Sequence, residues 1–177
     1  MRLSDLRPMI QTSRLGLRKL TLEDANERYV GWLNDPEVNV YLETRTATVQ
    51  GIRDYIDKKS SSDTALLLGI YWQQNDDFIG TVKLEPIDFA TGVATMGILI
   101  GDKVYWGKGV ATEVVNAITE YAFNSLGLSE VNLGVLGANL PAIRVYEKCG
   151  FATYQVDKNA RQHGDATYDQ VWMRRNK

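Results

Sequence analysis

Three apolar runs joined by two short polar turns restrict the fold more than any other feature of this sequence. The runs are residues 64–72, 78–87 and 93–101, and the turns between them are QQNDD and DFATG. Apolar runs bounded by turn-forming residues are typical of strands, and turns this short connect antiparallel neighbours. The sequence therefore predicts an antiparallel meander in the middle of the chain.

The segment before the meander is predicted to form a strand and then helices. Residues 12–20 alternate between apolar and polar or basic side chains, which indicates a strand with one buried face. Thr21 is a candidate N-cap for the next helix, with Asp24 placed as in a capping box. That helix should end near Asn34, because Pro36 disfavours helical backbone in the residue before it.

The remaining elements are predicted by the same patterns. Apolar side chains recur at helical spacing in three segments, which are residues 48–61, 110–126 and 139–149. Strand patterns occupy 130–137, 151–156 and 167–173, and a polar linker is expected at 157–166. This order predicts an α+β fold that covers residues 1–177 as one domain.

Composition excludes several kinds of function. The 177 residues carry a net charge of −2, which gives no electrostatic footprint for nonspecific nucleic-acid binding. Cys149 is the only cysteine and His163 the only histidine, so we expect no internal disulfide and no metal site. We expect Cys149 to be structural and His163 to be a solvated loop residue. No apolar run reaches the roughly 18 residues of a membrane span, and the N-terminal segment does not resemble a signal peptide, so a soluble cytoplasmic protein is expected.

The stretch YWGKGVATEVV, residues 105–115, places two glycines directly before an amphipathic helix. A helix start offers unpaired N–H groups and about half a positive charge, and small residues let a phosphate approach them. A Walker loop is excluded because Lys108 is followed by Gly109, and the dinucleotide fingerprint fails because Thr112 occupies its third glycine position. A phosphate cradle of another kind or an ordinary helix start remain.

Two segments together resemble the GCN5-related N-acetyltransferase family. WGKGVAT is similar to the family's CoA pyrophosphate loop, although Trp106 stands where a polar residue is usual. The second hallmark resembles residues 139–151, in which the matching positions are Asn139, Ala142, Tyr146, Gly150 and Phe151. The N-terminal TSRLGLRKLTLEDA also looks like the opening of the ribosomal-protein N-terminal acetyltransferases. The resemblance covers essentially the whole chain.

The resemblance implies a fold and a co-substrate. The fold would be one mixed, largely antiparallel sheet of about seven strands flanked by helices, splayed between the fourth and fifth predicted strands, residues 93–101 and 130–137. The co-substrate would be acetyl-CoA. Its pantetheine arm would pair with the backbone of Ile98, Leu99 and Ile100 and with the side chain of Asn139. Its pyrophosphate would lie over Gly107, Lys108, Gly109, Val110, Ala111 and Thr112.

The resemblance also implies that Tyr146 protonates the leaving thiolate, since a tyrosine keeps its proton at neutral pH. Helical spacing alone is equally compatible with a core tyrosine. Many relatives carry a glutamate as the base where this chain has Thr95. Glu85 and Asp88 are the candidates to replace that glutamate as the base, although each could also be an ordinary solvated charge. A relay of water molecules that removes the proton of the amine is a further alternative.

The absence of a strong base favours an acceptor amine with a low pKa. At pH 7.5 roughly a third of an α-amine is free base, against about one in a thousand for a lysine side chain. We therefore expect direct attack in a ternary complex by an α-amine of a protein or an amino sugar, with small polyamines and drugs as other acceptors to consider. Four residues after the first helix either contact the acceptor or pack in an ordinary loop: Trp32, Asn34, Tyr41 and Glu43.

A noncatalytic acyl-CoA sensor or interaction module on the same fold is the alternative from another functional class. It would keep the glycine loop and would not need Tyr146. Neither the net charge nor the composition distinguishes a monomer from a homodimer, and no nucleic-acid or membrane partner is expected.

Overall fold

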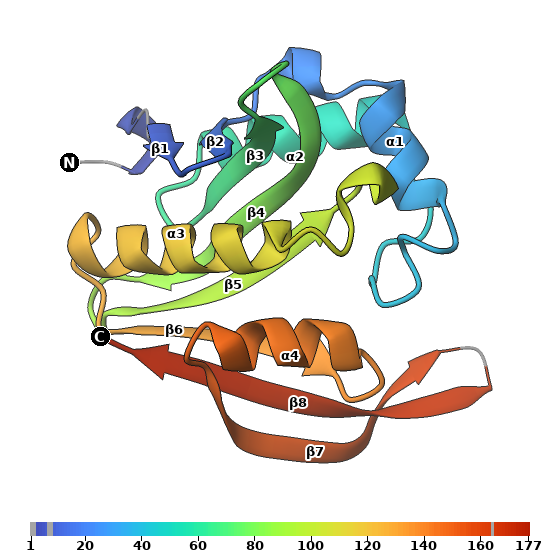
Figure 1. The fold of residues 1–177 in the computed structure, drawn as a ribbon, viewed down its shortest axis with the longest axis vertical. Helices are drawn as coiled ribbons and strands as arrows, with labels where there is room; N and C mark the ends of the chain where they lie inside the picture. The colour runs from blue at the N-terminus through green and yellow to red at the C-terminus, as the bar shows by residue number, and fades with distance from the viewer. Residues whose placement is uncertain (1–2, 7–8, 164) are drawn as a thin grey trace.

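A single eight-stranded sheet extends from one end of the described chain to the other, with strand order β1-β2-β3-β4-β5-β6-β8-β7 (Figure 1). The computed structural model describes residues 3–6, 9–163 and 165–177, without the side chains of Ser4 and His163. The strands are β1 (Met9–Gln11), β2 (Leu15–Lys19), β3 (Leu66–Trp72), β4 (Asp77–Asp88), β5 (Val93–Ile100), β6 (Glu130–Leu136), β7 (Ala152–His163) and β8 (Ala166–Asn176).

Helices cover both faces of this sheet. They are α1 (Glu27–Asn34), α2 (Val49–Ser60), α3 (Val110–Asn124) and α4 (Leu140–Lys148), with short 3₁₀ segments at Leu3–Asp5, Leu22–Asp24 and Lys103–Tyr105. Two buried clusters fill the molecule, one between the sheet and α3 and α4, and the other between the sheet and α1 and α2. Among the described residues, no helix is long and apolar enough to cross a membrane.

The sheet opens between β5 and β6. β4 pairs with β5 along nearly its whole length, from Gly80 opposite Ile100 to Asp88 opposite Val93. β5 and β6 are parallel and pair only over residues 93–95. Figure 1 shows the two strands diverging beyond this point. The α+β fold and the splay are therefore confirmed, with one strand more than the sequence predicts, because the three-residue β1 is too short to show a pattern.

The first helix begins later than its capping pattern predicts. The capping box of Thr21 and Asp24 is present, but it stabilises the 3₁₀ segment Leu22–Asp24. α1 starts at Glu27, and its N-cap is Asn26, whose side chain accepts hydrogen bonds from two backbone N–H groups of the first turn. The chain therefore has two N-caps within a few residues: Thr21 caps the 3₁₀ segment, and Asn26 caps the longer helix α1.

The predicted polar linker at 157–166 is wrong, because the strands β7 and β8 extend through most of it as a long antiparallel ribbon. Polar side chains satisfy one another across the ribbon. The Asp169 carboxylate accepts hydrogen bonds from Lys158 Nζ at 2.8 Å and from the Asn159 N–H at 3.0 Å. Asn159 takes a positive φ of 49° where the register shifts, a backbone conformation that asparagine tolerates.

Candidate functional site

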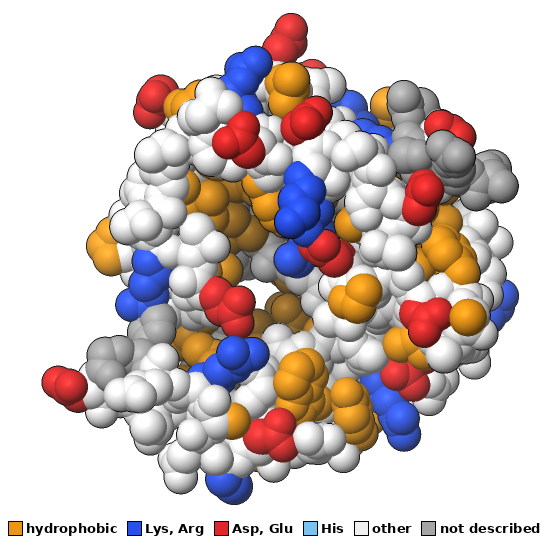
Figure 2. Space-filling view, turned by 180° about the vertical axis from the view of Figure 1, so that it is seen from behind, with side chains coloured by type: hydrophobic (Ala, Val, Ile, Leu, Met, Phe, Trp, Pro, Cys, Tyr) orange, Lys and Arg blue, Asp and Glu red, His pale blue; other side chains and the backbone are white. Residues whose placement is uncertain are grey.

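The divergence of β5 and β6 leaves a cleft of about 1160 Å³. Its walls come from the six strands β3 to β8, from α1, α2 and α4 with its N-cap, and from the segment 41–48. Figure 2 shows this face hollowed at its middle, with hydrophobic side chains in the hollow and charged side chains around it. Among the predicted donor and catalytic residues, Ile98, Leu99, Asn139 and Tyr146 line the cleft, whereas Ile100 and the loop at residues 107–112 are not among its lining residues.

Tyr146 lies on α4 and is buried, with 8% of its surface exposed. Its ring packs near Phe151, with 6.1 Å between the ring centroids. Burial, and secondarily the nearby Cys149 thiol, raises the pKa of Tyr146 to about 12. The phenol that lines the cleft is therefore protonated throughout the physiological pH range.

The start of α4 is as the sequence predicts. Asn139 is the N-cap, and its side-chain oxygen accepts a hydrogen bond from the Ala142 N–H at 3.3 Å. Pro141 lies in the first turn, where its missing N–H costs no helical hydrogen bond. Asn139 and Tyr146 both line the cleft, as do Thr95 to Leu99 of β5.

The two candidate bases differ in position. Glu85 lines the cleft and forms ion pairs with Lys59 and, at 3.5 Å, with Lys83. Burial raises the pKa of Glu85, but the two ammonium groups outweigh burial, so the net pKa lies below its usual value. Asp88 is exposed at the end of β4, where its carboxylate accepts hydrogen bonds from the N–H groups of Ala90 and Thr91 in the following turn. The Thr91 hydroxyl and then these two N–H groups lower the pKa of Asp88, which is not among the residues that line the cleft.

Thr95 lies where β5 and β6 last pair. Its hydroxyl donates a hydrogen bond to the side-chain oxygen of Asn132, the residue opposite it on β6, at 2.7 Å. Thr95 lines the cleft. Sequence reasoning missed Asn132, because nothing in its local pattern points to a partner on another strand.

The segment after α1 bridges the mouth of the cleft. Tyr41 donates a hydrogen bond to the Ala138 carbonyl at 3.4 Å, and Glu43 forms an ion pair with Arg161 at 3.2 Å. Tyr41 and Glu43 both line the cleft, and their contact with the acceptor stays a prediction.

The other two predicted acceptor residues have structural positions instead. Trp32 is buried in the cluster beneath α1 and packs so closely on Gly101 that a Cβ there would overlap its ring. The side-chain NH₂ group of Asn34 donates a hydrogen bond to the Ala47 carbonyl at 3.0 Å, and its side-chain oxygen accepts one from the Ala47 N–H at 2.8 Å. Trp32 therefore packs in the core, and Asn34 holds the loop.

The glycine loop lies between the end of β5 and the start of α3. Gly107 and Gly109 have φ values of 71° and 75°, a region that favours glycine. An added Cβ on Gly109 would meet no atom nearer than Arg14 Nη2 at 3.8 Å, and Gly107 has open space around it. Lys108 is exposed, and its ammonium lies 5.6 Å from the centroid of the Tyr105 ring. The arrangement is an open loop that ends in the free N–H groups of a helix start.

Trp106 takes a structural part in this loop. Its indole N–H donates a hydrogen bond to the Ile100 carbonyl at 2.8 Å, while the side chain stays 42% exposed. The bond ties the loop to the end of β5, so the departure from the usual polar residue has a structural consequence. A long-range bond of this kind leaves no trace in the local sequence.

Comparison with known proteins identifies the family. Residues 14–152 match the family model described as an acetyltransferase (GNAT) domain. The chain is 35% identical over 146 residues to the uncharacterized N-acetyltransferase p20 of Bacillus licheniformis, which covers 80% of this chain and 81% of that protein.

Solved structures share the fold. The spermidine N-acetyltransferase of Vibrio cholerae, in complex with CoA and spermine, superposes with a TM-score of 0.85 at 23% identity, over 93% of this chain and 96% of that one. A putative ribosomal-protein-serine acetyltransferase of the same organism gives 0.78 at 20% identity, over 98% and 99%. These relatives are named as acetyltransferases, which are enzymes, and not as acyl-CoA sensors. The chain belongs to the GNAT acetyltransferases, and it is an N-acetyltransferase with acetyl-CoA as its co-substrate.

Proposed function

We propose that the protein transfers the acetyl group of acetyl-CoA to a primary amine by direct attack in a ternary complex, and that the acceptor is an α-amine of a protein or an amino sugar. The observation that carries this proposal is the cleft between β5 and β6, which is lined both by a protonated tyrosine and by a strand edge that has no strand partner. We also propose that residues 1–177 act as one catalytic unit of the branch that resembles the ribosomal-protein N-terminal acetyltransferases.

The donor is assigned to the free edge of β5 and the glycine loop. Ile98, Leu99 and Ile100 lie beyond the last pair with β6, so backbone groups on this edge are available for an extended ligand, as in strand addition. Asn139 uses its side-chain oxygen as a helix cap, which leaves its NH₂ group for the pantetheine. The small residues from Gly107 to Thr112 would hold the pyrophosphate at the helix start.

Tyr146 is assigned as the general acid. In the reaction the amine nitrogen forms a bond to the acetyl carbon, the carbon–sulfur bond breaks, and the leaving sulfur takes a proton. Burial raises the pKa of Tyr146 to about 12, so the proton is present when sulfur leaves. The same burial would raise the pKa of the leaving thiol, so a thiolate in the cleft would accept a proton more readily than it does in water.

The ion pairs of the carboxylates in the cleft favour an acceptor whose amine is already unprotonated when it binds. Glu85 and Glu43 line the cleft, and each is already paired with cationic side chains. A carboxylate whose pKa is lowered is a weak proton acceptor, so Glu85 gives only modest help. An amine with a low pKa is already partly unprotonated at neutral pH and can attack without a base. The proton that its nitrogen loses after the attack then passes to water.

The same pairing makes a polyamine a poorer candidate, although a structural neighbour is a spermidine N-acetyltransferase. A polycation needs several carboxylates that are free to receive it, whereas those that line this cleft already have cationic partners. An acceptor with one amine avoids this competition.

An acceptor screen tests the proposal. Peptides with a free N-terminus, amino sugars, spermidine and an N-blocked lysine peptide are incubated with acetyl-CoA, and release of free thiol is followed. The highest kcat/KM is expected for an α-amine or a sugar amine. A lysine side chain or spermidine as the best acceptor would contradict the assignment.

The pH dependence gives a separate prediction. Between about pH 6 and pH 8, kcat/KM should rise with the free-base fraction of the acceptor. Because the pKa of Glu85 is lowered, its carboxylate is ionised over this whole range and adds no basic limb of its own. Glu85→Gln should therefore keep the shape of the profile and cost much less than loss of the Tyr146 hydroxyl.

Asp88→Asn is the matched control, since Asp88 lies at the end of β4 and is not among the residues that line the cleft. Its profile should coincide with that of the parent protein. If Glu85→Gln erases the basic limb and lowers kcat/KM as much as Tyr146→Phe, then Glu85 is a dedicated base.

A further inference from the structure

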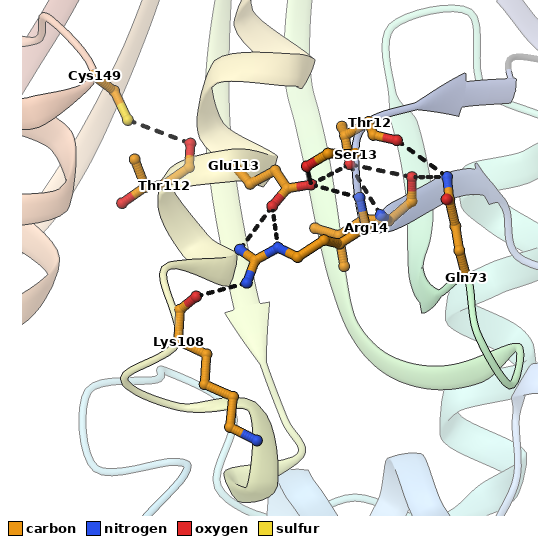
Figure 3. Close-up of polar contacts among 9 residues, drawn as sticks. Thr12, Ser13, Arg14, Gln73, Lys108, Thr112, Glu113 and Cys149 are labelled. Atoms are coloured by element: carbon orange, nitrogen blue, oxygen red, sulfur yellow. Dashed lines mark hydrogen bonds and ion pairs between the residues drawn. The ribbon is translucent and has the colours of Figure 1, made fainter.

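A charged network joins the segment before β2 to the first turn of α3 (Figure 3). Arg14 Nε and Nη2 contact Glu113 Oε2 at 2.8 and 2.7 Å, and the Arg14 N–H donates to Glu113 Oε1 at 3.0 Å. The hydroxyls of Thr12 and Ser13 also donate to Oε1. The Glu113 side chain is only 16% exposed, so this carboxylate is held by several donors in a partly buried place.

The remaining end of the same guanidinium reaches the glycine loop. Arg14 Nη1 donates a hydrogen bond to the Lys108 carbonyl at 2.9 Å, as Figure 3 shows. Lys108 stands between Gly107 and Gly109, both at positive φ, so the peptide units beside it have glycine on either side and rotate at little cost. The Arg14 bond therefore selects one orientation of the Lys108–Gly109 peptide.

That orientation matters for an anion. In a trans peptide the C=O and the N–H point in opposite directions. Because the Lys108 carbonyl is turned toward Arg14, the Gly109 N–H is turned away from it. A flipped peptide would instead present a carbonyl oxygen on the side where this N–H now lies, and an oxygen repels a phosphate.

The ion pair has a second consequence for the same loop. A carboxylate in the first turn stabilises a helix, but it also repels an anion that approaches the helix start. In this chain, several donors from residues 12–14 surround the Glu113 carboxylate and the Arg14 cation balances its charge. Without Arg14, a partly buried and uncompensated negative charge would remain one turn from the loop.

We propose that Arg14 is a positioning residue for acetyl-CoA: it orients the Lys108–Gly109 peptide toward the pyrophosphate and neutralises Glu113 beside it. The inference rests on the proposed placement of the pyrophosphate at residues 107–112. It assigns to the N-terminal segment a part in holding the donor, although Arg14 itself need not touch the ligand.

The test compares the two partners of one ion pair. Arg14→Gln should weaken CoA binding about tenfold or more, because it removes a charge-assisted bond to the loop and leaves Glu113 uncompensated. Glu113→Gln breaks the same ion pair but removes the negative charge, so CoA affinity should stay equal or increase. The double variant should recover part of the affinity lost in Arg14→Gln. Titration calorimetry with CoA measures all three, and thermal unfolding checks that each is folded.

A truncated donor separates positioning from a general structural defect. Arg14→Gln should raise KM for acetyl-CoA with little change in kcat, and it should leave kcat/KM for an acetyl thioester that lacks the pyrophosphate unchanged. Arg14→Lys keeps the charge without the forked donors and should fall between Arg14→Gln and the parent. It also serves as the test if the glutamine variant does not fold.

Equal losses of CoA affinity in Arg14→Gln and Glu113→Gln would overturn the proposal, as would an equal loss with the truncated thioester. If Gly109→Glu leaves CoA affinity unchanged, the placement of the pyrophosphate is wrong. If Gly109→Glu abolishes binding and Arg14→Gln does not weaken it, only the role of Arg14 is wrong.

Discussion

Gly109→Glu is expected to abolish CoA binding in a protein that remains folded. Gly109 is exposed at the start of α3, and an added Cβ has room there, so the change does not disturb packing. It places a carboxylate where the pyrophosphate is proposed to lie, and the repulsion acts at the helix start whose partial positive charge attracts the phosphates. Calorimetry with CoA measures the loss.

Two matched variants isolate the cause. Gly109→Ala carries the backbone cost of a positive φ, about 1–2 kcal/mol, without the charge, so it should retain most of the affinity. Gly31→Glu introduces the same charge at an exposed position of α1, where an added Cβ meets nothing, and should bind CoA normally. Parental CoA affinity in folded Gly109→Glu would refute the placement.

Tyr146→Phe is expected to lower kcat by about a hundredfold or more with little change in CoA affinity. The phenylalanine ring retains the packing near Phe151, and only the hydroxyl at the cleft is lost. General acid catalysis to the leaving sulfur then has no donor. Single-turnover acetyl transfer, measured with the best acceptor from the screen, reports the chemical step directly.

Tyr154→Phe provides the comparison, since Tyr154 is exposed on β7 and the same hydroxyl is removed away from the cleft. Its single-turnover rate should equal that of the parent. Full turnover in Tyr146→Phe, with chemistry shown to limit the rate, would assign Tyr146 to the hydrophobic core alone.

The elements that local signals define were predictable from the sequence. α4 has its cap, its first-turn proline and its apolar spacing within one short stretch, and the structure places Asn139 as that N-cap. The meander was predictable because its turns are short and its strands apolar. α1 shows the limit of this reasoning, since Thr21 and Asn26 are both acceptable caps and only tertiary packing distinguishes them.

Features that depend on contacts between distant segments were not predictable. The polar residues of β7 form a strand because partners on β8 satisfy them, and no periodicity records those partners. The pairing of Arg14 with Glu113 spans about a hundred positions of the sequence, so each residue alone looks like a solvated charge. The resemblance to a family indicated the cleft, but it did not show that Trp32 belongs to the core.

The short pairing of β5 with β6 has a thermodynamic consequence. Beyond residue 95 the edge of β5 toward β6 lacks a strand partner, so the unliganded sheet forgoes hydrogen bonds that a complete sheet would have. A donor that occupies this edge supplies them only in the folded state. Occupancy and conformational stability are then linked, and acetyl-CoA at a hundred times its dissociation constant would add about 2.7 kcal/mol to the free energy of unfolding. The free energy of unfolding of this protein would thus increase with the concentration of acetyl-CoA.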